Sequence, residues 1–237
     1  MHIEPFTESR LTAQRITGSG IAEAAHELAL RSGPDLTSDP LGVEGVRMAY
    51  GRNEEIFGEG EPARCVYRVL KGVVRTYRIL ADGRRQIAEF FLAGDVFGLA
   101  TAAEYSVSAE SVTDCEVVAI RRSQLNDKAT SDASTAQKLW ALTLHCLRRS
   151  EEHMLLLGRK GACERLAWFL IDMSERIPAT SRVELPMSRQ DIADFLGLTI
   201  ETVSRTMTQL QDEQVIELPS CRVVMLRDRQ ALLDLIA

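Results

Sequence analysis

Long apolar runs are missing from this chain of 237 residues. No run approaches the roughly 20 consecutive apolar residues that a helix needs to span a bilayer. The start of the chain, MHIEPFTESR, has no continuous apolar region like that of a signal peptide. The hydrophobic content of 45% and the charged content of 26% are those of a soluble globular protein. We therefore expect no membrane partner and a cytoplasmic location.

Cysteine and histidine are scarce, which limits the possible metal sites. The five cysteines form no CxxC pair and are odd in number, so neither a disulfide framework nor a zinc site is indicated. The four histidines lie outside the β-rich segment at 43–120 and do not support a haem site. No HxH with a carboxylate, no nucleophile beside a plausible base and no phosphate-cradling glycine loop is present. We expect no metal, no cofactor and no enzymatic activity.

Positive charge is also lacking. The formal net charge is −6, and from Lys160 onward nine Lys and Arg stand against twelve Asp and Glu. Because neutralisation of phosphates by Lys and Arg supplies most non-specific affinity for DNA, this part of the chain should bind non-specific DNA weakly. Recognition of DNA would have to depend on local placement of a few side chains, for which Arg182, Arg189 and Arg205 are candidates.

Residues 188–213, SRQDIADFLGLTIETVSRTMTQLQDE, predict two helices joined by a tight turn. Ser188 and Asp191 form a capping pattern, Gly197 ends the first helix, and Thr199 caps the second. The apolar positions expected to be buried are Ile192, Phe195, Leu196, Val203, Met207 and Leu210. The second helix then has an outward face that carries Glu201, Ser204, Arg205, Thr208 and Asp212.

Such a pair of helices is a helix-turn-helix, and its outward face can enter a DNA major groove. There an Arg can bind guanine O6 and N7, and a Glu can accept a hydrogen bond from cytosine N4. A second interpretation stays open on spacing alone. The helix dipole favours an acid such as Glu201 in the first turn, and Glu201 with Arg205 is an ordinary i,i+4 surface pair.

The run RQDIADFLGLTIETVSR resembles the DNA-binding signature of the CRP/FNR superfamily of bacterial transcription regulators, most closely its FNR and FixK-type branches. In those families a Glu-x-x-Ser-Arg motif opens the recognition helix, and residues 201–205 match it. The resemblance extends over nearly the whole chain from about Gly42 onward. It implies that bases are read by Glu201, Ser204 and Arg205, and that the DNA backbone is contacted by Ser188, Arg189, Thr199, Thr202 and Thr208.

The resemblance also implies a target and partners. The target is a double-stranded inverted repeat of the type TTG, spacer, CAA, with Arg205 on the guanine and Glu201 on the complementary cytosine or the neighbouring adenine. A homodimer binds it and contacts RNA polymerase as an activator. Related bacteria use such proteins for low-oxygen respiration and nitrogen fixation genes.

Residues 43–120 contain short β-rich runs separated by glycines, at 56–57, 66–70, 73–80, 86–92 and 115–120. This spacing predicts an antiparallel barrel or roll, and Asp82-Gly83 is a strong hairpin signal. The order of runs resembles the jelly-roll sensor domain of the superfamily. Nucleotide-binding members carry a Glu after the FG dipeptide and an Arg-Ser-Ala segment, where this chain has Leu99 and Val107-Ser108-Ala109. Without that Arg a cyclic phosphate loses its charged partner, so we expect no binding of cAMP.

The longest helical pattern lies at 131–158. Leu139, Leu142 and Cys146 recur at i, i+3 and i+7, and further apolar residues broaden the surface. We expect one face to pack on the roll and the other to form a two-helix dimer seam through Leu139, Leu142 and Cys146. Packing of these residues within one chain is the alternative. A dimer would place two recognition helices roughly 34 Å apart, one turn of DNA.

The expected fold class is α+β. We divide the chain into an N-terminal extension (1–40) with a short helix at 21–31, a jelly-roll sensor-like domain (41–130), a dimerisation helix (131–158) and a winged helix-turn-helix (159–237). The extension holds no cysteine, so it cannot supply the iron–sulfur ligands that oxygen-sensing FNR proteins have near their N-terminus. The wing is predicted as strands at 215–218 and 222–226 around a turn at Pro219 and Ser220.

Two further hypotheses concern control. Cys221 beside Arg222 is a candidate redox residue, because a thiol next to a cation is more readily oxidised and an oxidised sulfur would repel phosphate. The alternative function is an effector-gated regulator whose roll binds an unidentified small molecule.

Overall fold

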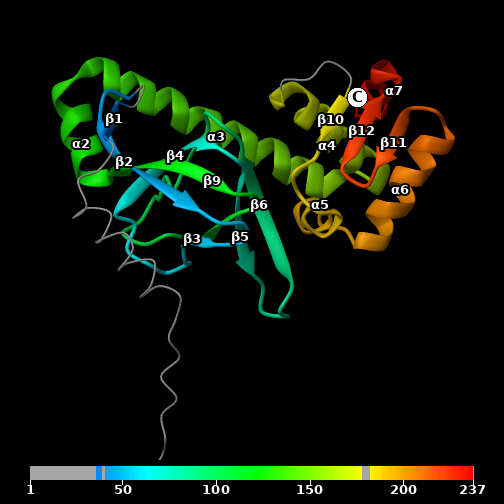
Figure 1. Ribbon diagram of the computed structural model, residues 1–237, viewed down its shortest axis with the longest axis horizontal. Helices are drawn as coiled ribbons and strands as arrows, with labels where there is room; N and C mark the ends of the chain where they lie inside the picture. Colours follow the sequence, from blue (N-terminus) through cyan, green and yellow to red (C-terminus); the bar gives the residue numbers. More distant parts are fainter. Residues whose placement is uncertain (1–35, 39–40, 178–181, 237) are drawn as a thin grey trace, which may run out of the picture.

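The structure is a computed structural model, and its described residues are 36–38, 41–177 and 182–236. Almost all of the N-terminal extension, including the helix predicted at 21–31, lies outside these ranges. Within them the chain forms an N-terminal β-roll and a C-terminal domain, and one long helix runs from the first to the second (Figure 1).

Two antiparallel sheets make up the β-roll. One has the order β1-β2-β9-β4-β7 and consists of β1 (Leu36–Ser38), β2 (Glu44–Tyr50), β9 (Cys115–Arg121), β4 (Cys65–Lys71) and β7 (Val96–Phe97). The other has the order β3-β8-β5-β6 and consists of β3 (Glu55–Phe57), β8 (Ser108–Ser111), β5 (Val74–Ile79) and β6 (Arg85–Phe91). Stacked rings of Phe57, Tyr67 and Phe97 lie in the core of the roll. The predicted roll is therefore confirmed.

The predicted β-rich runs correspond to β3, β4, β5, β6 and β9, and the hairpin at Asp82-Gly83 joins β5 to β6. Gly72, between β4 and β5, has a positive φ of 86°, and a Cβ there would lie 2.4 Å from the carbonyl oxygen of Asp114. Only glycine fits this position without a shift of the backbone. Four strands of the roll were missed, β1, β2, β7 and β8.

Helix α2 (Arg122–Ser131) precedes the long helix α3 (Ala133–Arg159). The prediction of one helix from residue 131 is corrected, because the chain turns at Asp132, whose backbone is extended (φ −131°, ψ 108°). The side chain of Asp132 accepts a hydrogen bond from the Ser134 N–H and so caps α3. Helix α3 then continues without interruption to the C-terminal domain (Figure 1).

The C-terminal domain packs four helices on a three-stranded sheet in the order β10-β12-β11. Its elements are α4 (Ala162–Arg176), β10 (Arg182–Glu184), α5 (Arg189–Leu196), α6 (Ile200–Asp212), β11 (Ile216–Ser220), β12 (Val223–Leu226) and α7 (Arg229–Ile236). The wing turn was misplaced, because β11 continues through Pro219 and Ser220 with an irregular register and the chain reverses at Cys221 and Arg222.

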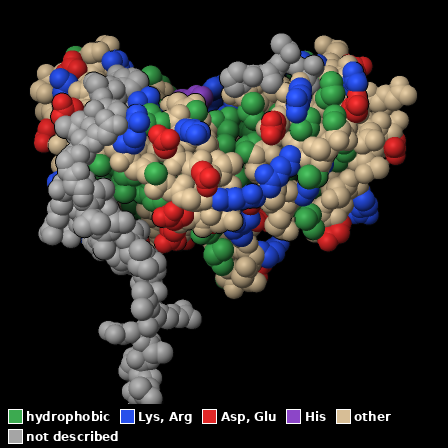
Figure 2. Space-filling model, viewed as in Figure 1, with side chains coloured by type: hydrophobic (Ala, Val, Ile, Leu, Met, Phe, Trp, Pro, Cys, Tyr) green, Lys and Arg blue, Asp and Glu red, His purple; other side chains and the backbone are tan. Residues whose placement is uncertain are grey.

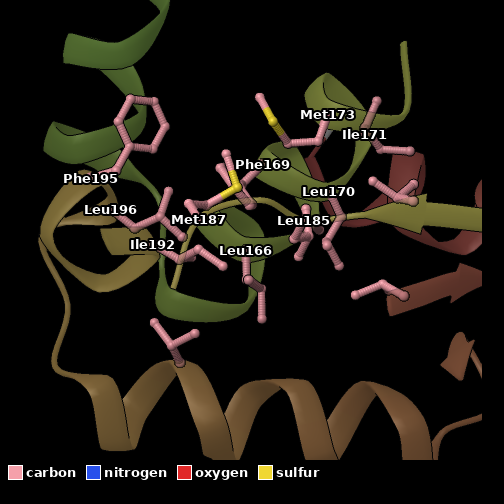
Figure 3. Packing of buried hydrophobic residues seen from close by; sticks show 14 of the residues in the cluster. Leu166, Phe169, Leu170, Ile171, Met173, Leu185, Met187, Ile192, Phe195 and Leu196 are labelled. Carbon is pink, nitrogen blue, oxygen red and sulfur yellow. The ribbon is translucent and has the colours of Figure 1, made fainter. Parts of the chain in front are cut away.

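A single hydrophobic cluster joins the two domains. In the C-terminal domain it includes Leu166, Phe169 and Phe195, and in the roll it includes Ile87 and Phe90. On the surface, Lys and Arg side chains gather where the two domains meet (Figure 2). Figure 3 shows how side chains of α4 and α5 point toward one another above α6. The helix-turn-helix is thus packed against the roll as well as within its own domain.

Candidate nucleic-acid interface

Helix α5 begins at a complete capping box. Ser188 Oγ accepts a hydrogen bond from the Asp191 N–H (3.1 Å), and Asp191 Oδ2 accepts hydrogen bonds from the Ser188 N–H (3.0 Å) and from Ser188 Oγ (2.8 Å). The predicted cap is confirmed. The predicted phosphate contact of Ser188 is not supported, because both of its donors already point at Asp191.

The turn between α5 and α6 follows the prediction. Gly197 adopts the left-handed conformation (φ 62°, ψ 38°) that ends α5, which glycine reaches without the steric cost of a Cβ. Thr199 then caps α6, since its Oγ1 accepts a hydrogen bond from the Thr202 N–H at 3.2 Å. These two caps fix where α6 starts and therefore which side chains it presents to solvent.

One face of α6 is buried and the other is open. Val203, Met207 and Leu210 are at most 1% exposed and pack in the domain core. The exposed side chains of the opposite face are Glu201, Ser204, Arg205, Thr208 and Asp212. This burial pattern confirms the prediction for α6. A shallow hollow runs along this face and is lined by Ser204, Arg205, Thr208, Gln209, Asp212 and Glu213.

The charged groups at the start of α6 are available for an outside partner. The pKa of Glu201 is lowered by a hydrogen bond from its own backbone N–H, then by Thr199 and by the charge of Arg205, so Glu201 is ionised and can only accept hydrogen bonds at neutral pH. Among the described residues, Arg205 has no salt bridge within 4.0 Å and no side-chain hydrogen bond. The alternative interpretation, a closed Glu201–Arg205 surface pair, is not realised as a salt bridge.

The residues predicted to contact the DNA backbone differ in their hydrogen bonds and in their burial. Thr199 Oγ1 and Thr202 Oγ1 lie 3.0 Å apart and share one hydrogen bond, in which either hydroxyl can be the donor. Thr208 Oγ1 donates to the Ser204 carbonyl at 3.2 Å. Arg182 is exposed on β10, whereas Arg189 is half-buried, and its Nη1 is buried without a partner among the described residues. Burial lowers the pKa of Arg189, and the nearby Cys221 opposes this shift.

Cys221 lies exposed in the reversal between β11 and β12. Cys65 and Cys115 are buried in the roll, and Cys146 and Cys163 are half-buried. Cys221 is therefore the exposed thiol among the described residues, and it neighbours Arg189 on the wing side of α5.

The predicted seam residues of α3 are corrected by their placement. Leu139, Leu142 and Cys146 are half-buried on the side that faces the roll: Leu139 packs on a roll cluster, and the other two line a cavity. The exposed apolar residues of α3 are Trp140, Leu144, Leu147, Met154 and Leu155. Residues 140, 144, 147 and 154 follow the four-three spacing of a two-helix seam. This spacing was already visible in the sequence, where it begins at Trp140, one position after the predicted Leu139.

A cavity of about 270 Å³ lies between the roll and α3. Its apolar lining includes Phe91, Val96, Val107, Leu142 and Cys146. The arginines that border it, Arg149 and Arg176, form salt bridges with Glu89, Asp95 and Asp172 at 2.8–3.5 Å. Leu99 packs in an apolar cluster. Both arginines at this cavity are thus already paired with carboxylates.

In the part of the chain that the structure describes, no group of three or more His, Cys, Asp or Glu side chains is placed to hold a metal ion. None of its helices is long and apolar enough to cross a membrane.

Comparisons with known proteins cover both domains. The model of the Crp-like helix-turn-helix domain matches residues 164–235, and that of the cyclic nucleotide-binding domain matches residues 47–132. The chain is 52% identical over 193 residues to the nitrogen fixation regulation protein FixK of Azorhizobium caulinodans, covering 79% of this chain and 78% of that one. It is 42% identical to the transcriptional activatory protein AadR of Rhodopseudomonas palustris, covering 70% and 72%. The solved structure of FixK2 from Bradyrhizobium japonicum matches with a TM-score of 0.79 and 48% identity, covering 81% of this chain and 98% of that one.

Proposed function

The chain belongs to the CRP/FNR family of transcription regulators, in its FixK-type branch, and from this membership we propose that it binds an inverted repeat of the type TTG, spacer, CAA as a homodimer. Each protomer reads one half-site with Glu201, Ser204 and Arg205. Arg205 binds the guanine, Glu201 accepts from the complementary cytosine or the neighbouring adenine, and Ser204 supports these contacts.

The open face of α6 carries this proposal. Its first two turns present an ionised carboxylate and an arginine without a salt bridge in the described residues, and these groups can bind the cytosine and the guanine of a G·C pair. The polar face is held in place by two capped helix starts and a buried apolar face. We assign the contacts with phosphates on either side to Thr199, Thr202, Thr208 and Arg189, whose half-buried guanidinium has a buried Nη1 without a partner among the described residues.

The exposed apolar face of α3 supports dimerisation through this helix. Trp140 is 66% exposed, Leu147 53% and Met154 65%, which is costly for a helix in water unless a second surface covers them. A second copy of α3 fits, because these residues follow the spacing of a two-helix seam. Replacing Leu147 with Glu should yield monomers in sedimentation experiments, whereas Gln137→Glu on the same helix should leave the dimer intact.

The relatives suggest what the dimer regulates. One bears the name nitrogen fixation regulation protein and another transcriptional activatory protein. By analogy the protein acts in the cytoplasm as an activator, contacts RNA polymerase, and serves nitrogen fixation or low-oxygen genes.

The cavity under α3 favours a second candidate function, an effector-gated regulator. Its volume of about 270 Å³ and mixed lining would suit a small uncharged molecule rather than a nucleotide. In that case the purified protein would need the small molecule before it binds DNA tightly.

Control through Cys221 is a separate hypothesis. Peroxide would convert its thiolate to a sulfenic acid with release of water or hydroxide, and further oxidation would add negative charge close to the DNA surface. Mild peroxide should therefore lower the DNA affinity of the wild type but not of Cys221→Ser. Equal losses in both proteins would contradict this role.

The proposed function is tested by binding of the purified protein to the palindrome at fixed moderate salt without added ligand. Arg205→Ala and Glu201→Ala should each weaken binding by about 1–3 kcal/mol per half-site, because each removes a base contact. Gln211→Ala, an exposed residue near the end of α6, is the control and should bind like the wild type. Variants that bind as tightly as the wild type would contradict the assigned base readers. Weak binding by all four proteins would favour the effector-gated alternative or a different operator.

A further inference from the structure

The carboxylate of Asp191 accepts hydrogen bonds from both domains. One carboxylate oxygen, Oδ2, completes the capping box of α5. The other, Oδ1, accepts hydrogen bonds from Arg75 Nη1 at 3.0 Å and Arg85 Nη2 at 2.5 Å, and both arginines belong to the β-roll. Asp191 is only 4% exposed, so this cluster is shielded from solvent. The first helix of the helix-turn-helix is therefore tied by its N-terminal turn to strands β5 and β6.

The two arginines are themselves held in position. Arg75, 5% exposed, also bonds Glu110 at 2.9 Å and Asn53 at 3.3 Å inside the roll. Arg85 places its Nε 2.7 Å from Asp194 Oδ2, one turn further along α5. Arg75 and Arg85 lie on the two strands of one hairpin and together bind two successive turns of α5. These contacts resist rotation of α5 about its own axis.

An apolar contact continues this junction along α5. The ring of Phe195 stacks on His153 of α3 with centroids 4.1 Å apart and packs on Phe90 of β6 at 5.3 Å. The carbonyl oxygen of Phe195 lies 2.9 Å from His153 Nε2 and accepts from Gln86 Nε2 at 3.3 Å. Both ends of α5 are thus bonded to the roll or to the long helix.

Helix α6 cannot turn independently of α5, because a short turn joins them and their apolar faces share one core. The direction in which α6 points relative to α3 therefore depends on where α5 is fastened. In a dimer built on α3, that direction decides how far apart the two recognition helices lie.

We propose that Arg75 and Arg85 are positioning residues for DNA recognition: by holding Asp191 and Asp194 they fix α5, and so set the separation and orientation of the two recognition helices. The proposal depends on the proposed function, namely binding of an inverted repeat by a homodimer. It adds that the roll, without touching DNA, determines which spacing between half-sites is accepted.

A ratio of two affinities tests this role. Two linked half-site contacts raise affinity by about 10²–10⁴ when both can form at once, and this gain is lost when the geometry forbids it. We would measure the affinity of the full chain for a set of palindromes whose spacer changes by single base pairs, and for a duplex with one half-site. The ratio of palindrome to half-site affinity reports the geometry of the dimer, and half-site affinity reports α6 alone.

Arg85→Met removes the guanidinium but keeps an apolar stem, and it should lower the ratio at the preferred spacing by roughly 10-fold or more while flattening the dependence on spacer length. Arg85→Lys should fall between this variant and the wild type. Asp194→Asn leaves the capping box intact and should change the ratio in the same direction by less, which keeps the test decisive if Arg85→Met folds poorly. Arg78→Met is the matched control, because Arg78 lies in the same hairpin, is exposed and pairs with Glu59 of the roll.

The possible results distinguish a failure of the positioning role from a failure of the proposed DNA binding. If the wild type binds none of the palindromes better than a half-site, the proposed function fails and the dimeric readout with it. If the wild type prefers one spacing and both Arg85→Met and Asp194→Asn keep the same ratio and preference, the positioning role is wrong. A variant whose half-site affinity falls as much as its palindrome affinity has a damaged domain, and that result would also overturn the role.

Discussion

Helix α5 and helix α6 are joined by a turn of three residues, yet their polar side chains have opposite surroundings. On α5, Asp191 and Asp194 bind arginines of the β-roll, and Ser188 just before it is engaged with Asp191. On α6, Ser204 and Arg205 are exposed, and Arg205 has no salt bridge within the described ranges. The carboxylates of α5 are paired inside the molecule, whereas the charged side chains of α6 are exposed to solvent.

This difference indicates how the motif divides its tasks. A buried carboxylate with two arginines fixes geometry, because removing either partner leaves an uncompensated charge. An exposed arginine contributes little to stability and can be used for a partner outside the chain. Folding should therefore be sensitive to the polar residues of α5 and DNA binding to those of α6.

The largest effect on stability is expected at Asp191. Asp191→Ala should lower the free energy of unfolding by about 3–5 kcal/mol, because it removes one of the two carboxylates that pair with the buried Arg75, one of the two that pair with Arg85, and the cap of α5. Asp212→Ala, an exposed aspartate of α6, should change it by less than about 0.5 kcal/mol. Urea unfolding followed by circular dichroism measures both. Similar small effects would show that the Asp191 cluster does not hold the domains together.

The second largest effect on stability is expected at Gly197, in the turn between α5 and α6. Gly197→Ala should cost about 1–2 kcal/mol, because an alanine must adopt the left-handed conformation at φ 62°. Its Cβ would lie 3.4 Å from Arg165 Nη1 and from Leu157, which are ordinary contacts, so the backbone accounts for the loss. Gly158→Ala within α3 should change stability in the opposite direction, by about 0.5 kcal/mol. The midpoints of urea unfolding compare them, and a stable Gly197→Ala protein would mean that the turn is not fixed.

His153, where α3 meets α5, should make stability depend on pH. Burial lowers its pKa from the ordinary value of 6.5, so the unfolded chain takes up a proton at a higher pH than the folded chain does. Acidification through pH 6.5 and below should therefore destabilise the protein, by at most about 1.4 kcal/mol per pH unit for this one group. His153→Gln should show a shallower loss of melting temperature between pH 7.5 and 5.5. Parallel pH profiles for the two proteins would assign the effect elsewhere.

The features of the motif that depend on neighbours in sequence were predicted well. Ser188, Gly197 and Thr199 were placed correctly because caps and left-handed turns are determined by residues within one helical turn. The burial of Val203 and Met207 followed from helical spacing for the same reason.

Features that depend on distant residues were missed. Arg75 and Asp191 are 116 positions apart, and neither residue carries a local signal that it meets the other. Strand β8, with the sequence SAES, is polar and becomes a strand because it pairs between β3 and β5. On α3 both faces are apolar, so spacing alone did not show that Leu139 faces the roll while Trp140 faces outward.

The smallest effect is expected at Thr208, and its comparison with Thr206 contrasts the two faces of α6 itself. Both hydroxyls donate to the carbonyl four residues earlier, but Thr206 is 6% exposed and Thr208 is exposed. Thr208→Val should change the free energy of unfolding by less than about 0.5 kcal/mol, and any loss should appear as weaker DNA binding. Thr206→Val, which alters only the buried side, should leave the DNA affinity unchanged. Since the Thr208 hydroxyl has one proton and already donates it to Ser204, it can donate to a phosphate only by giving up that bond. Equal DNA affinity for both variants and the wild type would therefore remove Thr208 from the set of backbone contacts.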